Sequence, residues 1–70
     1  MKATVKYNSG LWLVIPKKAN APFLFLEWMS RFNAGANIKV IDEGELIKIR
    51  LNHCLREQYI EAAEYINANL

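Results

Sequence analysis

Apolar and polar residues alternate over residues 37–51, and this pattern predicts a pair of antiparallel strands. We place the turn at Glu43-Gly44, because a two-residue turn needs a positive φ that glycine adopts freely. Side chains of a strand alternate between its two faces, so one face is apolar and the other is basic. The expected apolar face comprises Ile38, Val40, Ile47, Ile49 and Leu51, and the basic face comprises Lys39, Lys48 and Arg50.

This register puts Lys39 directly opposite Lys48. Like charges in such positions weaken a sheet by about a few tenths of a kcal/mol. Two interpretations stay open. Either the basic face binds an anion, or the two long side chains splay apart in solvent at little energetic cost.

Residues 2–16 predict another hairpin, whose turn at residues 8–10 allows two registers. A three-residue turn with its glycine in the left-handed conformation pairs Tyr7 with Leu11 and puts Trp12 on the same face as the lysines. A two-residue turn pairs Tyr7 with Trp12 and swaps the faces of the second strand. We expect the three-residue turn, because it buries three aliphatic side chains.

Apolar residues at helical spacing predict two helices. The first begins at Asn20 or Ala21 and ends near residue 34, before Gly35. The second follows Asn52 as N-cap and runs from about residue 53 to the end of the sequence. The expected buried stripes comprise Leu24, Phe25, Trp28, Met29 and Phe32 in the first helix, and Leu55, Tyr59, Ala62, Ala63, Ile66 and Leu70 in the second.

The order of elements is ββαββα, so we expect an α+β fold in which two helices pack on one face of a four-stranded, mostly antiparallel sheet. The 70 residues form a single domain, residues 1–70. A chain of this length buries only ~60% of its unfolded surface, so a homodimer would add stability. Phe23 and Leu26 fall outside the apolar stripe of the first helix. They either flank a wide core or form a dimer patch.

Composition excludes several kinds of site. One cysteine and one histidine make neither an internal disulfide nor a four-ligand zinc site, and we expect no metal or other cofactor. The longest apolar runs fall short of the ~18 residues that span a membrane, and no signal-peptide pattern opens the chain. We therefore expect a cytoplasmic protein. The net charge of +2 does not by itself indicate nucleic-acid binding.

The open face of the predicted sheet is the main candidate site. Aromatic and basic side chains on such a face are used both by single-stranded nucleic-acid binders and by protein interfaces. We favour a protein partner, because the apolar residues between the cations suit a protein surface. The alternative is a single-stranded nucleic acid. The candidate residues are Lys6, Trp12, Lys39, Ile41, Leu46, Lys48 and Arg50, with Val14 beside them.

Two smaller candidates remain. Lys17 and Lys18 precede a predicted helix N-terminus, where an anion is favoured, although a solvated loop explains them as well. His53 and Cys54 open the second helix, but no third group orients them for catalysis. We therefore expect a small non-enzymatic binding protein that inhibits or modulates a macromolecular partner. By analogy, stand-alone domains of this kind include phage-encoded inhibitors.

Overall fold

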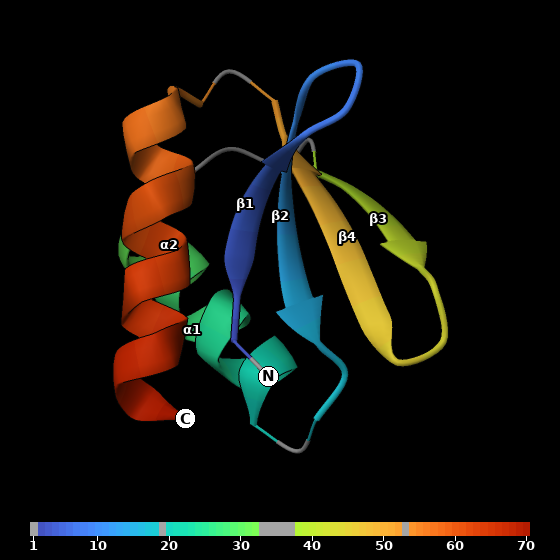
Figure 1. Ribbon diagram of the computed structural model, residues 1–70. Coiled ribbons are helices and arrows are strands. Elements are labelled where there is room, and N and C mark those ends of the chain that lie inside the picture. The colour runs from blue at the N-terminus through green and yellow to red at the C-terminus, as the bar shows by residue number, and fades with distance from the viewer. Residues whose placement is uncertain (1, 19, 33–37, 53) are drawn as a thin grey trace.

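The computed structural model describes residues 2–18, 20–32, 38–52 and 54–70, which contain four strands and two helices (Figure 1). The sheet has the order β1-β2-β4-β3, and all neighbouring strands are antiparallel. The predicted ββαββα order and α+β class are confirmed. The strands are β1 (Thr4–Tyr7), β2 (Leu11–Pro16), β3 (Ile38–Asp42) and β4 (Leu46–Leu51), and the helices are α1 (Ala21–Phe32) and α2 (Arg56–Asn69).

Both helices lie on one face of the sheet, and the other face, which we call the outer face, is not covered by either of them (Figure 1). Helix α2 packs against β1, β2 and α1, while α1 packs against α2 and β2. The core therefore lies between the helices and the inner faces of β1, β2 and β4. Its side chains are Ala3, Leu13, Ile15, Ala21, Phe25, Trp28, Ile49, Leu51, Tyr59, Ala62, Ala63 and Ile66.

The first hairpin has the predicted three-residue turn. Tyr7 pairs with Leu11, and Gly10 has a φ of 122°, in the region that favours glycine. Ser9 also has a positive φ, of 54°. This register turns Leu13 and Ile15 into the core and Trp12 to the outer face.

The second hairpin differs from its predicted register by two residues. Lys39 lies opposite Arg50 and not opposite Lys48, so the predicted Lys39–Lys48 pair is wrong. The turn shifts because the Asp42 side chain accepts a hydrogen bond from the Gly44 N–H at 2.9 Å, and Glu43 N–H donates to the Leu46 carbonyl at 2.8 Å. An even shift leaves every side chain on its predicted face.

Helix α2 begins at Arg56, three residues later than predicted, and Asn52 is not its N-cap. Leu55 occupies the N-cap position, and its N–H donates to Gln58 Oε1 at 2.6 Å, which satisfies the start of the helix. Leu55 and Leu70, the two ends of the predicted stripe, are exposed. The buried part of the stripe is Tyr59, Ala62, Ala63 and Ile66.

The Tyr59 hydroxyl joins α2 to the sheet. It donates to the Leu51 carbonyl at 2.9 Å and accepts from the Leu51 N–H at 2.8 Å, and both groups are buried. The β2–β4 ladder ends at the Leu13–Ile49 pair, and Leu11 and Leu51 are the residues that would form its next hydrogen-bonded pair. The hydroxyl therefore satisfies the backbone of Leu51 where the ladder stops.

The Asn67 side chain joins α2 to the edge of β1. Its amide donates to the Ala3 carbonyl at 2.9 Å and accepts from the Ala3 N–H at 2.8 Å. A neighbouring strand would make the same two bonds. At this position, α2 thus takes the place of a fifth strand.

Candidate binding surface

The outer face gathers the candidate residues from all four strands. Lys6 lies opposite Trp12, Val14 lies opposite Lys48, and Lys48 also lies opposite Ile41 on β3. Because side chains alternate, these residues share one side of the sheet. The candidate residues on the outer face are Lys6, Trp12, Val14, Lys39, Ile41, Leu46, Lys48 and Arg50, and Thr4, Pro16 and Glu43 lie on the same face.

Trp12 is covered by two cationic side chains. The Arg50 Cζ atom lies 4.1 Å and the Lys48 Nζ atom 4.6 Å from the centroid of the indole ring. These are cation–π distances, and such contacts contribute about 0.5–2 kcal/mol each. The indole N–H donates to the Asn8 carbonyl at 2.9 Å. Trp12 is only 7% exposed, so it lies on the outer face as predicted but is not an open stacking platform.

Gly10 makes this arrangement possible. A Cβ atom at position 10 would lie 2.7 Å from Nη2 of Arg50, too close for the guanidinium to stay where it is. Nη2 also donates to the Ser9 carbonyl at 3.0 Å. The turn of the first hairpin therefore holds the guanidinium against Trp12. Arg50 Nε is buried and has no hydrogen-bond partner among the described residues.

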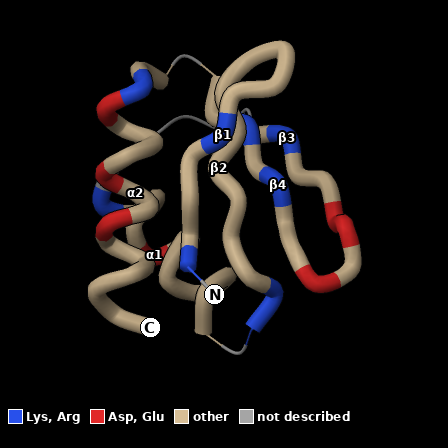
Figure 2. Tube along the Cα trace, in the orientation of Figure 1, with Lys and Arg blue, Asp and Glu red and all other residues tan. Residues whose placement is uncertain are grey.

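The four cations of the outer face form no ion pair within the described part of the chain. Among the described residues, the one ion pair joins Lys17 to Asp42 at 2.6 Å, and neither residue is one of these four cations. Figure 2 shows basic residues on β1, β3 and β4, and acidic residues at the β3–β4 turn and on α2. The acidic residues of α2 are Glu57, Glu61 and Glu64, all exposed. The outer face is therefore mainly basic. Glu43 lies at its hairpin end but forms no ion pair with these cations among the described residues.

The apolar part of the outer face is small. Val14 is buried, and Ile41 and Leu46 are half-buried. A hollow of about 190 Å³ lies among Lys6, Asn8, Trp12, Val14, Glu43, Leu46 and Lys48. Ligand pockets typically measure about 300–1,000 Å³. A hollow of this size suits the side chains of a macromolecular surface better than an enclosed small molecule.

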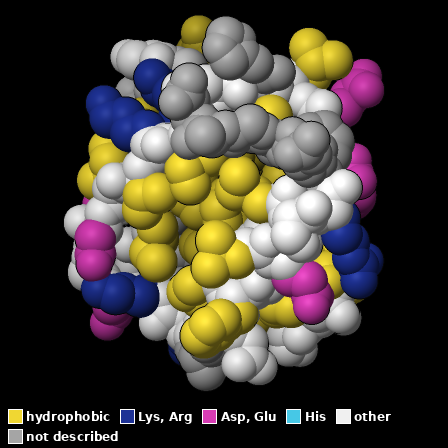
Figure 3. All heavy atoms as spheres, turned by 180° about the vertical axis from the view of Figure 1, so that it is seen from behind, with side chains coloured by type: hydrophobic (Ala, Val, Ile, Leu, Met, Phe, Trp, Pro, Cys, Tyr) yellow, Lys and Arg dark blue, Asp and Glu magenta, His cyan; other side chains and the backbone are white. Residues whose placement is uncertain are grey.

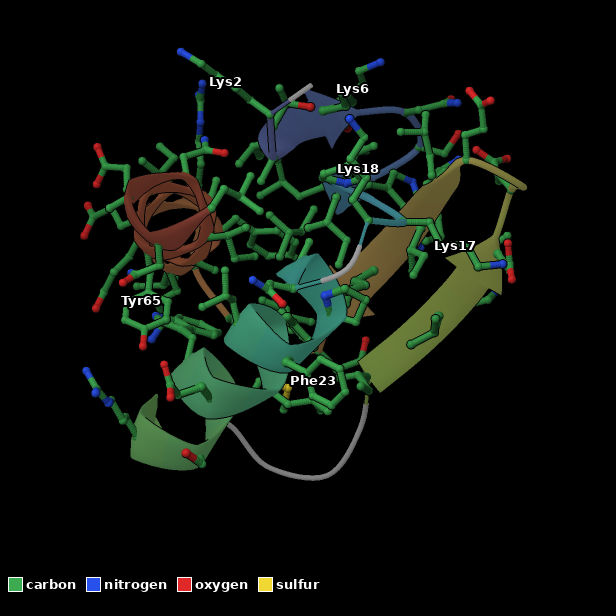
Figure 4. The ribbon with its side chains drawn as sticks, turned by 90° about the horizontal axis from the view of Figure 1, so that it is seen from below. Lys2, Lys6, Lys17, Lys18, Phe23 and Tyr65 are labelled. Carbon is green, nitrogen blue, oxygen red and sulfur yellow. The ribbon has the colours of Figure 1, made fainter. Side chains whose placement is uncertain are left out.

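Lys17, one residue of the predicted anion site, is already engaged. Its ammonium binds Asp42, and its backbone N–H donates to the Glu45 carbonyl at 2.8 Å. The hydrogen bond from Lys17, followed by that from the Gly44 N–H, lowers the pKa of the Asp42 carboxyl. Figure 4 shows Lys17 beside the end of β3, where it joins the end of β2 to the second hairpin. Lys18 is exposed.

The His53–Cys54 pair, which the sequence offered without an orienting third group, gains no support. His53 lies outside the described residues, and Cys54 precedes α2 instead of lying in its first turn. Burial raises the pKa of the Cys54 thiol, which disfavours the nucleophilic thiolate. Among the described residues, no three His, Cys, Asp or Glu side chains are placed to hold a metal ion, and no helix is long and apolar enough to cross a membrane.

A polar cluster between the two helices was not predicted. The Tyr65 hydroxyl donates to the Glu27 carboxylate, and the Arg31 guanidinium lies 5.4 Å from the centroid of the Tyr65 ring. The hydrogen bond to Glu27 raises the pKa of Tyr65. Helical spacing places Glu27 and Arg31 on one side of α1, but it does not indicate which residue of α2 they meet.

The structure thus supplies a basic outer face with a covered indole. Comparisons with protein-family models, with curated proteins and with solved structures found no match.

Proposed function

We propose that this chain is a small non-enzymatic binding protein that inhibits or modulates a protein partner by binding an acidic surface with its outer face. The observation that carries the proposal is the pair of cations held on Trp12, with Lys6 and Lys39 beside them and no carboxylate paired to any of the four among the described residues. Such a surface attracts acidic partners and fixes the register of their binding.

The geometry of Trp12 favours protein over nucleic acid. Proteins that bind single strands without sequence preference stack bases on exposed aromatic rings. The cationic groups of Arg50 and Lys48 lie over the Trp12 ring, so a base would have to displace one of them before it could stack on the ring. Ile41 and Leu46 lie half-buried next to the cations and supply apolar contact area for a protein side chain.

Single-stranded nucleic acid is the second candidate, because phosphates bind lysine and arginine without any stacking. In that case the logarithm of affinity falls linearly with the logarithm of salt concentration. Removal of one phosphate contact, by Lys48→Ala, reduces the slope by about one. An unchanged slope and affinity in Lys48→Ala would count against this candidate.

The experiment that tests the proposal is an affinity pull-down from a lysate of the source cells, with and without nuclease. The baits are the wild-type chain, a Lys39→Ala/Lys48→Ala variant, and a Lys2→Ala/Lys18→Ala control with the same net charge as that variant. We expect a protein that survives nuclease treatment and is captured by the wild type and the control, but not by the outer-face variant. Capture that is equal with all three baits would overturn the assignment of the outer face, and loss of all captured protein after nuclease would favour nucleic acid.

A further inference from the structure

We propose that two copies of this chain associate through the free edge of β3. The two β3 strands pair antiparallel about Val40 and join two four-stranded sheets into one sheet of eight strands. This interface does not rest on the proposed function, because it needs no other partner, although Lys39 of the outer face contributes to both.

The two edges of the sheet differ in how they are protected. At the β1 edge, the Asn67 side-chain amide hydrogen-bonds to the backbone N–H and C=O groups of Ala3, and α2 packs alongside the strand. At β3, the only extensive packing within the described chain is against β4. An exposed edge strand presents unpaired N–H and C=O groups that favour pairing with another strand. Among the described residues, no side chain hydrogen-bonds to the edge of β3 in this way, so this edge is the less protected of the two.

The hydrogen bonds of the second hairpin show which groups of β3 point outward. Glu43 N–H bonds to the Leu46 carbonyl, so in this register Lys39 and Ile41 also direct their backbone groups toward β4. In an antiparallel ladder the intervening residues face the other way. Ile38, Val40 and Asp42 thus direct their backbone N–H and C=O groups to the free edge.

These three residues are arranged symmetrically about Val40. In a two-fold antiparallel pair, Val40 faces Val40 of the second copy, and Ile38 faces Asp42 of the second copy. All three positions are then hydrogen-bonded pairs of the new ladder. No residue of β3 is left without a partner, and no shift of register is needed.

The charges of the hairpin are complementary in the same register. Lys39 and Glu43 are both on the outer face, since Glu43 borders the hollow there together with Lys48. Pairing about Val40 puts Lys39 opposite Ile41 of the second copy, so its two diagonal neighbours are Glu43 and Lys39 of the second copy, each at a Cβ separation of roughly 7–8 Å that long side chains can bridge. The symmetry makes the Lys39–Glu43 contact twice and the Lys39–Lys39 contact once, so contacts between opposite charges predominate. Figure 2 shows the basic end and the acidic turn of the hairpin that would lie side by side.

The helix side of the same edge carries exposed apolar side chains. Val40 is 54%, Leu26 57% and Phe23 72% exposed. Figure 4 shows Phe23 on the side of α1 that faces β3, and Leu26 follows one helical turn later on the same side. The space-filling view from this side shows apolar side chains gathered at its centre (Figure 3). A second copy at the β3 edge would cover part of this surface.

Sedimentation velocity of the purified chain tests the interface, with three charge variants. Lys39→Glu puts two glutamates near each other across the interface, and Glu43→Lys puts two lysines there. We expect either single variant to raise the dimer dissociation constant about tenfold. The Lys39→Glu/Glu43→Lys double variant restores opposite charges and should return the dissociation constant to near that of the wild type. Lys6→Glu, on the outer face near β1, is the charge control and should leave the dissociation constant unchanged.

A proline variant tests the backbone pairing. The Val40 N–H points to the free edge, so Val40→Pro removes no bond within the monomer but two symmetry-related bonds of the dimer. Tyr7→Pro is the control, because Tyr7 is also exposed and its N–H also points outward, at β1. We expect Val40→Pro to be a folded monomer by circular dichroism and Tyr7→Pro to remain a dimer. A wild-type chain that is monomeric up to its solubility limit would overturn the proposal, and so would a dimer that Val40→Pro does not weaken or that the charge double variant does not rescue.

Discussion

Removal of a single oxygen atom, by Tyr59→Phe, should destabilise the fold strongly. The Tyr59 hydroxyl makes both a donated and an accepted hydrogen bond to the backbone of Leu51, at 2.9 and 2.8 Å. Tyr59 is 2% and Leu51 3% exposed, so water does not readily replace the hydroxyl. The phenyl ring keeps its packing, and the change isolates the two hydrogen bonds.

The expected loss follows from the groups that are left unsatisfied. A buried N–H or C=O group without a partner costs about 1–3 kcal/mol. Two such groups, with some relaxation of the chain, give a loss of about 2–4 kcal/mol. A domain of this length has a free energy of unfolding of roughly 4–10 kcal/mol. Tyr59→Phe thus removes a large part of the stability.

Urea unfolding followed by circular dichroism measures this loss. With a slope of about 1 kcal/mol per M, expected for a small domain, the midpoint should fall by about 2 M or more. Tyr7→Phe is the matched control, because Tyr7 is 79% exposed and its hydroxyl makes no hydrogen bond within the described chain. The control should stay within about 0.5 kcal/mol of the wild type. A Tyr59→Phe variant as stable as the control would refute this account of how α2 is joined to β4.

Three further outcomes are expected. Gly10→Ala should lower the free energy of unfolding by about 1–3 kcal/mol in urea, because φ is 122° there and the new Cβ displaces Arg50. An unchanged midpoint would refute this. The pKa of Asp42, measured by NMR titration, should lie below 3.8 and rise toward that value in Lys17→Gln. Since the folded-state pKa is the lower one, the stability from this group is present above pH 3.8 and is lost as the pH falls through the folded pKa. Asp42→Asn should remove that part of the pH dependence. Finally, Cys54 should react with a thiol reagent at pH 8 more slowly in the folded chain than in urea, because its pKa is raised above 9.0, and equal rates would contradict this.

Alternation along the chain was sufficient to predict which strand residues share a face. The second hairpin shows why this is robust. Its register is two residues away from the predicted one, because Asp42 caps the turn through its side chain, yet Lys39, Ile41 and Lys48 stay on the outer face. A like-charge pair is also present, because Lys39 lies opposite Arg50 where Lys48 was predicted.

The burial of Trp12 could not be predicted in the same way. It depends on Arg50, which bonds to Ser9 from 41 positions away in the sequence. It depends as well on the absence of a side chain at Gly10. Local pattern reports the face on which a side chain lies, whereas its exposure is decided by neighbours that only the fold brings together. The start of α2 was misplaced for a related reason, since Gln58 and not Asn52 satisfies its first turn.

The cations stacked on Trp12 have a consequence for the thermodynamics of binding. Free lysine and arginine side chains each carry about 2 kcal/mol of rotamer entropy, and a partner that immobilises them removes it. Lys48 and Arg50 are already restrained by the indole, and Arg50 also by its bond to Ser9, so much of that entropy is lost when the chain folds. Binding at these two residues should therefore carry a smaller entropic penalty than binding at Lys39 or Lys6. Affinity at the outer face would then be concentrated on β4, next to Trp12.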